Sequence, residues 1–217
     1  MEVGTIREPA RGQTARARIE RNGGVARVLP ITADPAPLGL GAFALTTLIL
    51  SVFNTGLVSS AGEPVVLGVA FAYGGLAQLL AGMWEFRTGN TFGAVAFTSY
   101  GAFWLSFGAF AQFFKASVPV AHLPHTLALF LIAWGIFTAY MWIASFRVSV
   151  AVNLVFLALA VTFFLLGIGN AVDSTSVVKA GGWAGIATAG FAWYASFAAV
   201  LNSTFNRTVL PLKELKR

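Results

Sequence analysis

Long apolar stretches separated by short polar segments dominate the chain from residue 34 onward. A membrane-spanning helix needs about 20 apolar residues, because the hydrocarbon core of a bilayer is about 30 Å thick. The runs are continuous rather than alternating, so the strands of a membrane β-barrel are not expected. The pattern predicts an all-α polytopic membrane protein with six transmembrane helices over residues 34–206. The predicted spans are Leu38–Ser59, Pro64–Trp84, Thr91–Phe114, His125–Ala144, Val150–Asn170 and Gly181–Leu201.

The composition supports this fold class and excludes others. Hydrophobic residues make up 57% and charged residues 10% of the 217 residues. A soluble domain has about 45–50% apolar and about 25% charged residues. A compact soluble domain and a disordered chain are therefore both excluded. Because the sequence has no cysteine and only two histidines, we expect neither a metal centre nor a cofactor.

The basic residues predict the orientation in the membrane. With the N-terminus inside, twelve Lys and Arg residues lie on the cytoplasmic side and two, Lys115 and Lys179, lie outside. Cytoplasmic loops carry an excess of Lys and Arg, so both termini are expected in the cytoplasm. The cytoplasmic set is Arg7, Arg11, Arg16, Arg18, Arg21, Arg27, Arg87, Arg147, Arg207, Lys213, Lys216 and Arg217. Since these residues are concentrated at the termini, we expect the lipid bilayer and not nucleic acid as a partner.

Two polar tails flank the predicted bundle. Residues 1–33 are rich in Arg and lack the apolar core of a secretory signal. We expect a disordered basic cytoplasmic tail that can touch anionic lipid headgroups, with an amphipathic regulatory helix as the alternative. Residues 207–217 form the predicted cytoplasmic C-terminal tail.

No Asp, Glu, Lys or Arg lies at the centre of a predicted span, which argues against an ion pump. Glu85, at the cytoplasmic end of the second span, is either a solvated interfacial partner of Arg87 or a site of proton coupling. Uncharged polar residues are frequent instead, and they form interhelical hydrogen bonds or line a neutral path. The candidate pore-lining residues are Asn54, Gln78, Asn90, Thr91, Thr98, Ser99 and Asn170.

Small residues recur at helix-packing spacing in the last span. Gly181 and Gly185 form a GxxxG pattern that continues to Ala189. Small residues let helix backbones approach closely. The pattern is equally compatible with packing inside the bundle and with packing between subunits.

The segment before the first span has a distinctive composition. Asp34 can cap a helix, and a proline can occupy the first turn, where its missing N–H costs nothing. The free amides of a helix N-terminus can bind an anion, but a well-capped helix start explains the same residues. The segment reads Asp34, Pro35, Ala36, Pro37, Leu38, Gly39 and Leu40.

This segment resembles the signature of the acetate uptake transporter family, the succinate–acetate permeases. The family signature is Asn-Pro-Ala-Pro-Leu-Gly-Leu, and Asp34 stands here in place of its asparagine. Other matching segments extend the resemblance over residues 34–211. They include Phe43–Thr47, Tyr73–Gln78, Gly89–Gly93, Ala96–Gly101, Trp134–Gly135, Phe137–Thr138, Ile168–Asn170 and Arg207–Pro211.

The resemblance implies a homo-hexamer of six-helix protomers, each with its own pore. It implies transport of acetate, and for some members succinate, across the cytoplasmic membrane by proton symport or channel-like passage. The family's hydrophobic constriction corresponds here to Phe43, Tyr100 and Leu159. Such a ring of apolar side chains can gate a pore by dewetting. Asp34 puts a carboxylate where the family has an amide, and we expect backbone amides to cap it.

Other functions compete with a carboxylate pathway. A channel for a neutral solute such as urea, ammonia or water is the main alternative, because a neutral polar lining permits it. A membrane-embedded enzyme is not expected, since the spans hold no cysteine and no central pair of carboxylates. A scaffold or sensor would move no solute after reconstitution.

Overall fold

The computed structural model describes residues 17–22, 25–30, 32–213 and 215. The chain divides into two compact units, Met1–Asp34 and Pro35–Arg217.

The first unit contains a two-stranded antiparallel sheet. Strand β1 (Ala17–Asn22) pairs with β2 (Val25–Pro30), with Ala17 opposite Pro30. The sequence analysis predicted disorder for this stretch, so the hairpin is a difference. Its signal was in the sequence: the strands are separated by Gly23-Gly24, a pair typical of two-residue hairpin loops. Arg7, Arg11 and Arg16 lie outside the described residues, and the cytoplasmic placement of the tail stays a prediction.

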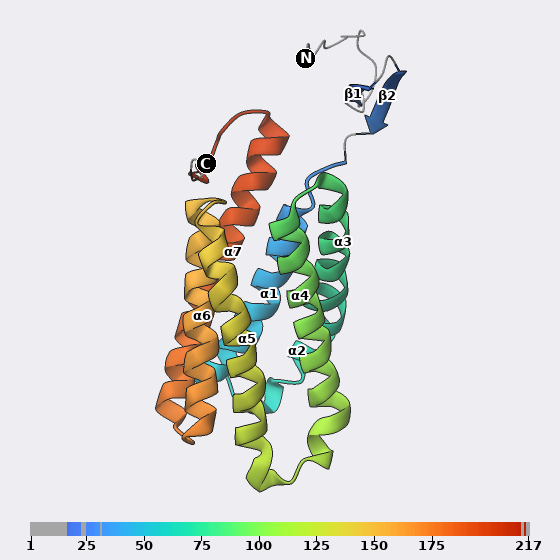
Figure 1. The fold of residues 1–217 in the computed structure, drawn as a ribbon. Helices are drawn as coiled ribbons and strands as arrows, with labels where there is room; N and C mark the ends of the chain where they lie inside the picture. The colour runs from blue at the N-terminus through green and yellow to red at the C-terminus, as the bar shows by residue number, and fades with distance from the viewer. Residues whose placement is uncertain (1–16, 23–24, 31, 214, 216–217) are drawn as a thin grey trace. The chain divides into compact units, whose positions relative to one another are not determined.

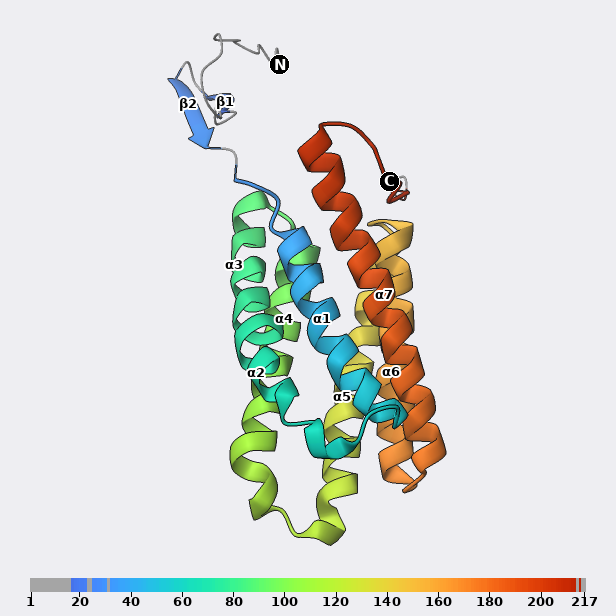
Figure 2. The ribbon, with the colours of Figure 1, turned by 180° about the vertical axis from the view of Figure 1, so that it is seen from behind.

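The second unit is a bundle of six helical spans, which confirms the predicted fold class (Figures 1 and 2). A π-helical turn interrupts the second span, and π- or 3₁₀-helical turns end the third span and begin the fourth. The first three spans are α1 (Ala36–Thr55), then α2 (Val65–Phe71) with the π-helix η2 (Ala72–Ala77) and α3 (Gln78–Thr88), then α4 (Thr91–Ala109) with η3 (Phe110–Phe114) and η4 (Lys115–Ser117). The last three are η5 (Val120–His122) with α5 (Leu123–Ser145), α6 (Val150–Ala171) and α7 (Thr175–Phe205), and a 3₁₀ turn, η1 (Ser60–Gly62), joins the first two spans.

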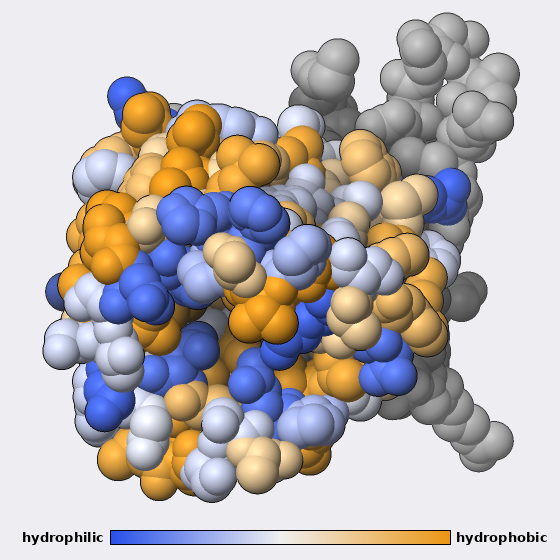
Figure 3. All heavy atoms as spheres, turned by 90° about the horizontal axis from the view of Figure 1, so that it is seen from below, coloured by the Kyte–Doolittle hydropathy of each residue, from blue (hydrophilic) through white to orange (hydrophobic). Residues whose placement is uncertain are grey.

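Successive spans run in opposite directions, so the bundle has two distinct ends. We call the end where α1 begins and α7 ends the terminal end, and the opposite end the distal end (Figure 1). At the distal end, hydrophilic residues gather toward the middle of the face and hydrophobic residues dominate its rim (Figure 3). This distribution suits an end of the bundle that meets water, with apolar side chains around it.

The outer face of α5 shows why the bundle suits a membrane. Leu129, Ile136 and Ile143 follow one another at intervals of two helical turns and are 73%, 61% and 66% exposed. A helix in a soluble domain turns such an apolar stripe toward the core. Here the opposite stripe, with Gly135 and Thr138, is buried. The exposed stripe is therefore available to lipid or to an apolar face of another protomer.

Several helix boundaries differ from the predicted ones by a few residues, as the end of α1 and the start of α7 show. Helix α1 ends at Thr55 and not at Ser59, because Gly56 adopts a left-handed conformation (φ 77°) and donates to the Phe53 carbonyl. This is the usual way in which glycine stops a helix. Helix α7 begins at Thr175, well before Gly181.

The GxxxG pattern packs inside the bundle. A Cβ atom on Gly182 would lie 2.6 Å from the Thr55 backbone nitrogen of α1, and Gly185 abuts the Ser51 side chain. Gly181 faces Leu166 of α6 in the same way. The small residues of α7 therefore hold α1 and α6 against it, which decides between the two interpretations of the pattern.

Candidate functional site

A small cavity lies among the helices of the bundle. The volume open to the centre of a water molecule is about 20 Å³, which is room for about one water. Residues from α1, α3, α4 and α6 form its wall. They are Leu40, Phe43, Gln78, Ala96, Phe97, Tyr100, Val155, Phe156 and Leu159.

The three residues predicted to form a constriction meet at this cavity. Phe43 comes from α1, Tyr100 from α4 and Leu159 from α6, and they are 4%, 2% and 3% exposed. The Phe43 and Tyr100 ring centroids are 5.7 Å apart. The side chains therefore close the centre of the bundle to any solute larger than water.

The Tyr100 ring is packed on several sides by other aromatic rings. Its centroid lies 5.5 Å from that of Phe137 and 6.0 Å from that of Trp134, both on α5. Phe156 of α6 is also 6.0 Å away. Tilted and edge-to-face contacts of this kind stabilise aromatic clusters beyond the area that they bury. The ring is therefore held in one position across the cavity.

The hydroxyl of Tyr100 reaches a residue that sequence reasoning did not select. Its oxygen is 2.9 Å from the Thr138 hydroxyl oxygen on α5, and Thr138 is fully buried. A signal was available, because Phe137–Thr138 is one of the segments that carry the family resemblance. Helix periodicity alone does not distinguish a threonine that bonds to a neighbouring helix from one that bonds only to its own helix.

Gln78 is the amide in the cavity wall. It is 1% exposed, and its Oε1 atom has no hydrogen-bond partner among the described residues. It directly follows the π-helix η2, whose wider turn changes the helix register, and such bulges are frequent at functional sites. A buried acceptor without a partner is costly, so Oε1 is placed to accept a hydrogen bond from water or another donor in the cavity.

The segment of the family signature only partly reaches the cavity. Pro35 occupies the N-cap position of α1, and Asp34 directly precedes it. Proline tolerates this place, because the first N–H groups of a helix have no intrahelical partner. Ala36 and Pro37 form the first turn, and Asp34 and Leu38 are exposed. Gly39 and Leu40 point inward, with Gly39 against the Phe97 ring and Leu40 in the cavity wall.

Most of the other polar candidates lie away from the cavity. Asn90 caps α4 by accepting a bond from the Gly93 N–H (3.1 Å), and Asn170 donates to the Leu166 carbonyl (2.8 Å). Both bonds are local, and neither residue is in the cavity wall. The remaining candidates, Asn54, Thr91, Thr98 and Ser99, are also outside the cavity wall.

Glu85 is not a solvated interfacial group. It is 1% exposed in α3, whereas Arg87 is exposed, so the interpretation as an interfacial pair is wrong. Residues two apart on a helix point in different directions, so the two environments differ. The Thr88 hydroxyl donates to Glu85 Oε2 (3.0 Å), and Gly93 of α4 lies beside the carboxylate. Glu85 is therefore a buried carboxylate outside the cavity wall.

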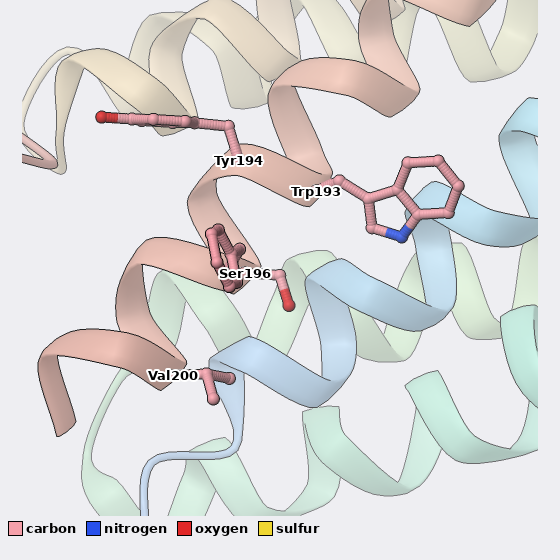
Figure 4. Close-up of a pocket in the computed structure, with 5 residues that line it drawn as sticks. Trp193, Tyr194, Ser196 and Val200 are labelled. Atoms are coloured by element: carbon pink, nitrogen blue, oxygen red, sulfur yellow. The ribbon is translucent and has the colours of Figure 1, made fainter. Parts of the chain in front are cut away.

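A larger hollow lies elsewhere, along α7. It measures about 470 Å³ and is lined by Trp193, Tyr194, Ser196, Phe197 and Val200 (Figure 4). The Ser196 hydroxyl donates to the Pro37 carbonyl of α1 (2.7 Å). This hollow shares no residue with the cavity at Tyr100, and its exposed aromatic rings suit a lipid-facing surface.

Comparisons with known proteins agree on one family. The sequence profile of the GPR1/FUN34/yaaH family matches residues 22–216. The chain is 40% identical to the succinate-acetate/proton symporter SatP of Escherichia coli K12, over 84% of this chain and 96% of that protein. It is 42% identical to acetate permease A of Emericella nidulans, over 83% of this chain and 65% of that protein. The solved bacterial acetate channel SatP matches with a TM-score of 0.79 and 38% identity, over 84% of this chain and 99% of that chain.

Proposed function

Because this chain belongs to the GPR1/FUN34/yaaH family, we propose that it moves acetate across the membrane through the cavity at Phe43, Tyr100 and Leu159. The observation that carries the proposal is the closure of the bundle at these three side chains. The likeness to the bacterial acetate channel SatP over most of both chains supports it. Succinate, which the printed name of SatP includes, is a second candidate substrate.

The chemistry of acetate fits the cavity wall. A carboxylic acid of this kind has a pKa near that of a Glu side chain, about 4.3, so at neutral pH it is almost entirely an anion. An anion crosses a lipid core poorly, and a protein path removes that barrier. The apolar wall accommodates the methyl group. The Gln78 side-chain NH₂ group is the donor that a carboxylate needs, whereas the unpartnered Oε1 can accept only from water or from the protonated acid. When the rings part, water and the solute enter together, as in hydrophobic gating.

The mode of passage is either channel-like or proton symport. No Asp, Glu, Lys or Arg is in the cavity wall, which favours channel-like passage. Proton symport would use the buried carboxylate of Glu85, or protonation of the solute itself. The two modes differ in whether a pH gradient is required.

The proposed setting is the cytoplasmic membrane, with both termini of the chain in the cytoplasm. The described cations Arg87, Arg147, Arg207 and Lys213 belong to segments at the terminal end, and Lys115 and Lys179 belong to segments at the distal end. Since cytoplasmic loops carry an excess of Lys and Arg, this distribution supports a cytoplasmic location for the terminal end. The proposed assembly is a homo-hexamer with a pore in each protomer, as the family resemblance implies.

The test is uptake of labelled acetate into proteoliposomes, with and without an imposed pH gradient. Uptake above that of empty liposomes without a gradient supports channel-like passage, whereas accumulation only under a gradient supports symport. Swelling in urea or ammonium without acetate uptake would replace acetate by a neutral solute. Vesicles that move none of these solutes would leave the proposal without support.

A further inference from the structure

The far end of the Tyr100 side chain is fixed to α5 by a directed pair of hydrogen bonds. The Thr138 hydroxyl oxygen lies 2.9 Å from the Tyr100 hydroxyl and 2.7 Å from the Trp134 carbonyl oxygen. A carbonyl oxygen can only accept, so the single proton of Thr138 is donated to Trp134. The Tyr100 O–H is therefore the donor to Thr138.

This direction determines what Tyr100 presents to the cavity. Its ring is in the wall, but Thr138 is not, so the hydroxyl points past the wall toward α5. The single phenolic proton is used by Thr138 and is withheld from solutes in the cavity. Three contacts of Tyr100 come from α5: the hydrogen bond to Thr138 and the ring contacts with Trp134 and Phe137.

We propose that Thr138 is a positioning residue that latches Tyr100 in the closed position. The latch rests on the proposed function, in which solutes pass where Tyr100 now stands. The ring cannot leave the cavity while its hydroxyl stays bonded to Thr138. Opening therefore breaks the Tyr100–Thr138 bond, and the strength of that bond sets the closed population.

Two substitutions remove the bond with different consequences. In Thr138→Val the shape is conserved, but a buried phenol is left without its acceptor, which penalises the closed state. In Tyr100→Phe the ring remains, and Thr138 keeps its bond to Trp134, so the penalty is smaller. We therefore expect the open population to be largest in Thr138→Val, smaller in Tyr100→Phe and smallest in the wild type.

Thr188 provides a matched control. Like Thr138 it is 0% exposed, and it donates to the carbonyl four residues earlier (Ala184, 2.8 Å). Its second neighbour is the Thr162 hydroxyl at 3.2 Å, not a residue of the cavity wall. Thr188→Val therefore makes the same chemical change at equal burial without touching Tyr100.

The experiment measures uptake of acetate and of the bulkier butyrate into proteoliposomes without a pH gradient. Thr138→Val is expected to raise acetate uptake about two- to tenfold, the effect of one ordinary hydrogen bond, and to raise the butyrate-to-acetate ratio. Thr138→Ser, which keeps the hydroxyl, and Thr188→Val are expected to match wild type. The double variant of Tyr100→Phe and Thr138→Val should be non-additive, because both changes remove one bond.

Several outcomes would overturn the latch. One is equal acetate uptake in Thr138→Val and Thr188→Val. Another is equal uptake in Thr138→Ser and Thr138→Val, and the third is additive effects on uptake in the double variant. Wild-type vesicles without acetate uptake would overturn the proposed function instead. In that case the latch is tested by the osmotic water permeability of the same vesicles. A higher permeability with Thr138→Val than with Thr188→Val supports the latch, and equal permeabilities overturn it.

Discussion

At the scale of single residues, the constriction is selective mainly through size. Phe43, Tyr100 and Leu159 fill it with apolar surface, and the Tyr100 hydroxyl is turned toward α5. Gln78 then supplies the side-chain amide that faces the cavity. Discrimination between solutes therefore depends on how far the apolar side chains must part and on what the Gln78 amide can bind.

Replacing Leu159 by Ala is expected to widen the constriction and raise the ratio of butyrate to acetate uptake. Truncating a buried leucine costs about 2–5 kcal/mol of stability, so the ratio, rather than the total uptake, is the informative quantity. Leu131→Ala is the control, because Leu131 is 9% exposed in the core of α5 but is outside the cavity wall. An equal ratio in both variants would contradict a role for Leu159 in selection.

Replacing Gln78 by Glu is expected to lower acetate uptake at least about tenfold at neutral pH. A carboxylate in the cavity wall repels a permeating anion at short range in a low-dielectric site. Uptake of a neutral solute should change little, and the uncharged Gln78→Met variant separates charge from lost hydrogen bonding. Equal effects of Glu and Met on acetate would show that the charge of the solute does not matter at this position.

At the scale of elements, close helix contacts set where the side chains of the cavity meet. Helix α3 approaches α4 where Gly82 faces Thr98 and where Gly101 faces Leu79. Upstream, in η2, Gly74 faces Thr46 of α1. The π-helix and its glycines place Gln78, at the start of α3, in the cavity wall with residues of α1 and α4.

The contact between α7 and the C-terminal end of α1 is expected to tolerate no added methyl group. Gly182→Ala puts a Cβ atom 2.6 Å from the Thr55 nitrogen, and overpacking of this kind costs about 1–3 kcal/mol. Gly190→Ala on the same helix meets no atom within 4 Å, so it should be neutral or stabilise by about 0.4–1 kcal/mol. Thermal unfolding in detergent measures both, and equal melting temperatures would show that the two helices separate easily.

At the scale of the whole molecule, the bundle has an apolar perimeter and two ends of unequal charge. Exposed apolar residues such as Leu129 and Ile143 fix it in the membrane without fixing its direction. The proposed direction rests on the cations, whose excess among the described residues of the bundle lies at the terminal end. It is therefore an electrostatic property of the loops and tails, separate from the packing of the helices.

The orientation can be tested directly, because the natural sequence has no cysteine to remove. Ser117 near the distal end and Thr208 near the terminal end are both exposed, and each can be replaced by Cys. In intact cells, a membrane-impermeant thiol reagent should label Ser117→Cys and spare Thr208→Cys. Both should react once the membrane is permeabilised, and the reverse pattern in intact cells would place the termini outside.

The sequence by itself determined the fold class and the number of spans. A segment enters the membrane because of its own length and apolarity, which are local properties, and the six predicted spans match six observed ones. The candidate constriction also came from the sequence, through its resemblance to a family. The hairpin that was missed and the early end of α1 are local features as well, because Gly23-Gly24 and Gly56 indicate them in the sequence.

Only the tertiary structure decided which polar groups share a site. Hydropathy does not fix how a helix is rotated about its axis when most of its faces are apolar. The burial of Glu85, the place of Gln78 in the cavity wall and the Tyr100–Thr138 bond all depend on that rotation. Tyr100 and Thr138 are 38 residues apart in the chain, and their contact exists because close packing brings α4 and α5 into one register.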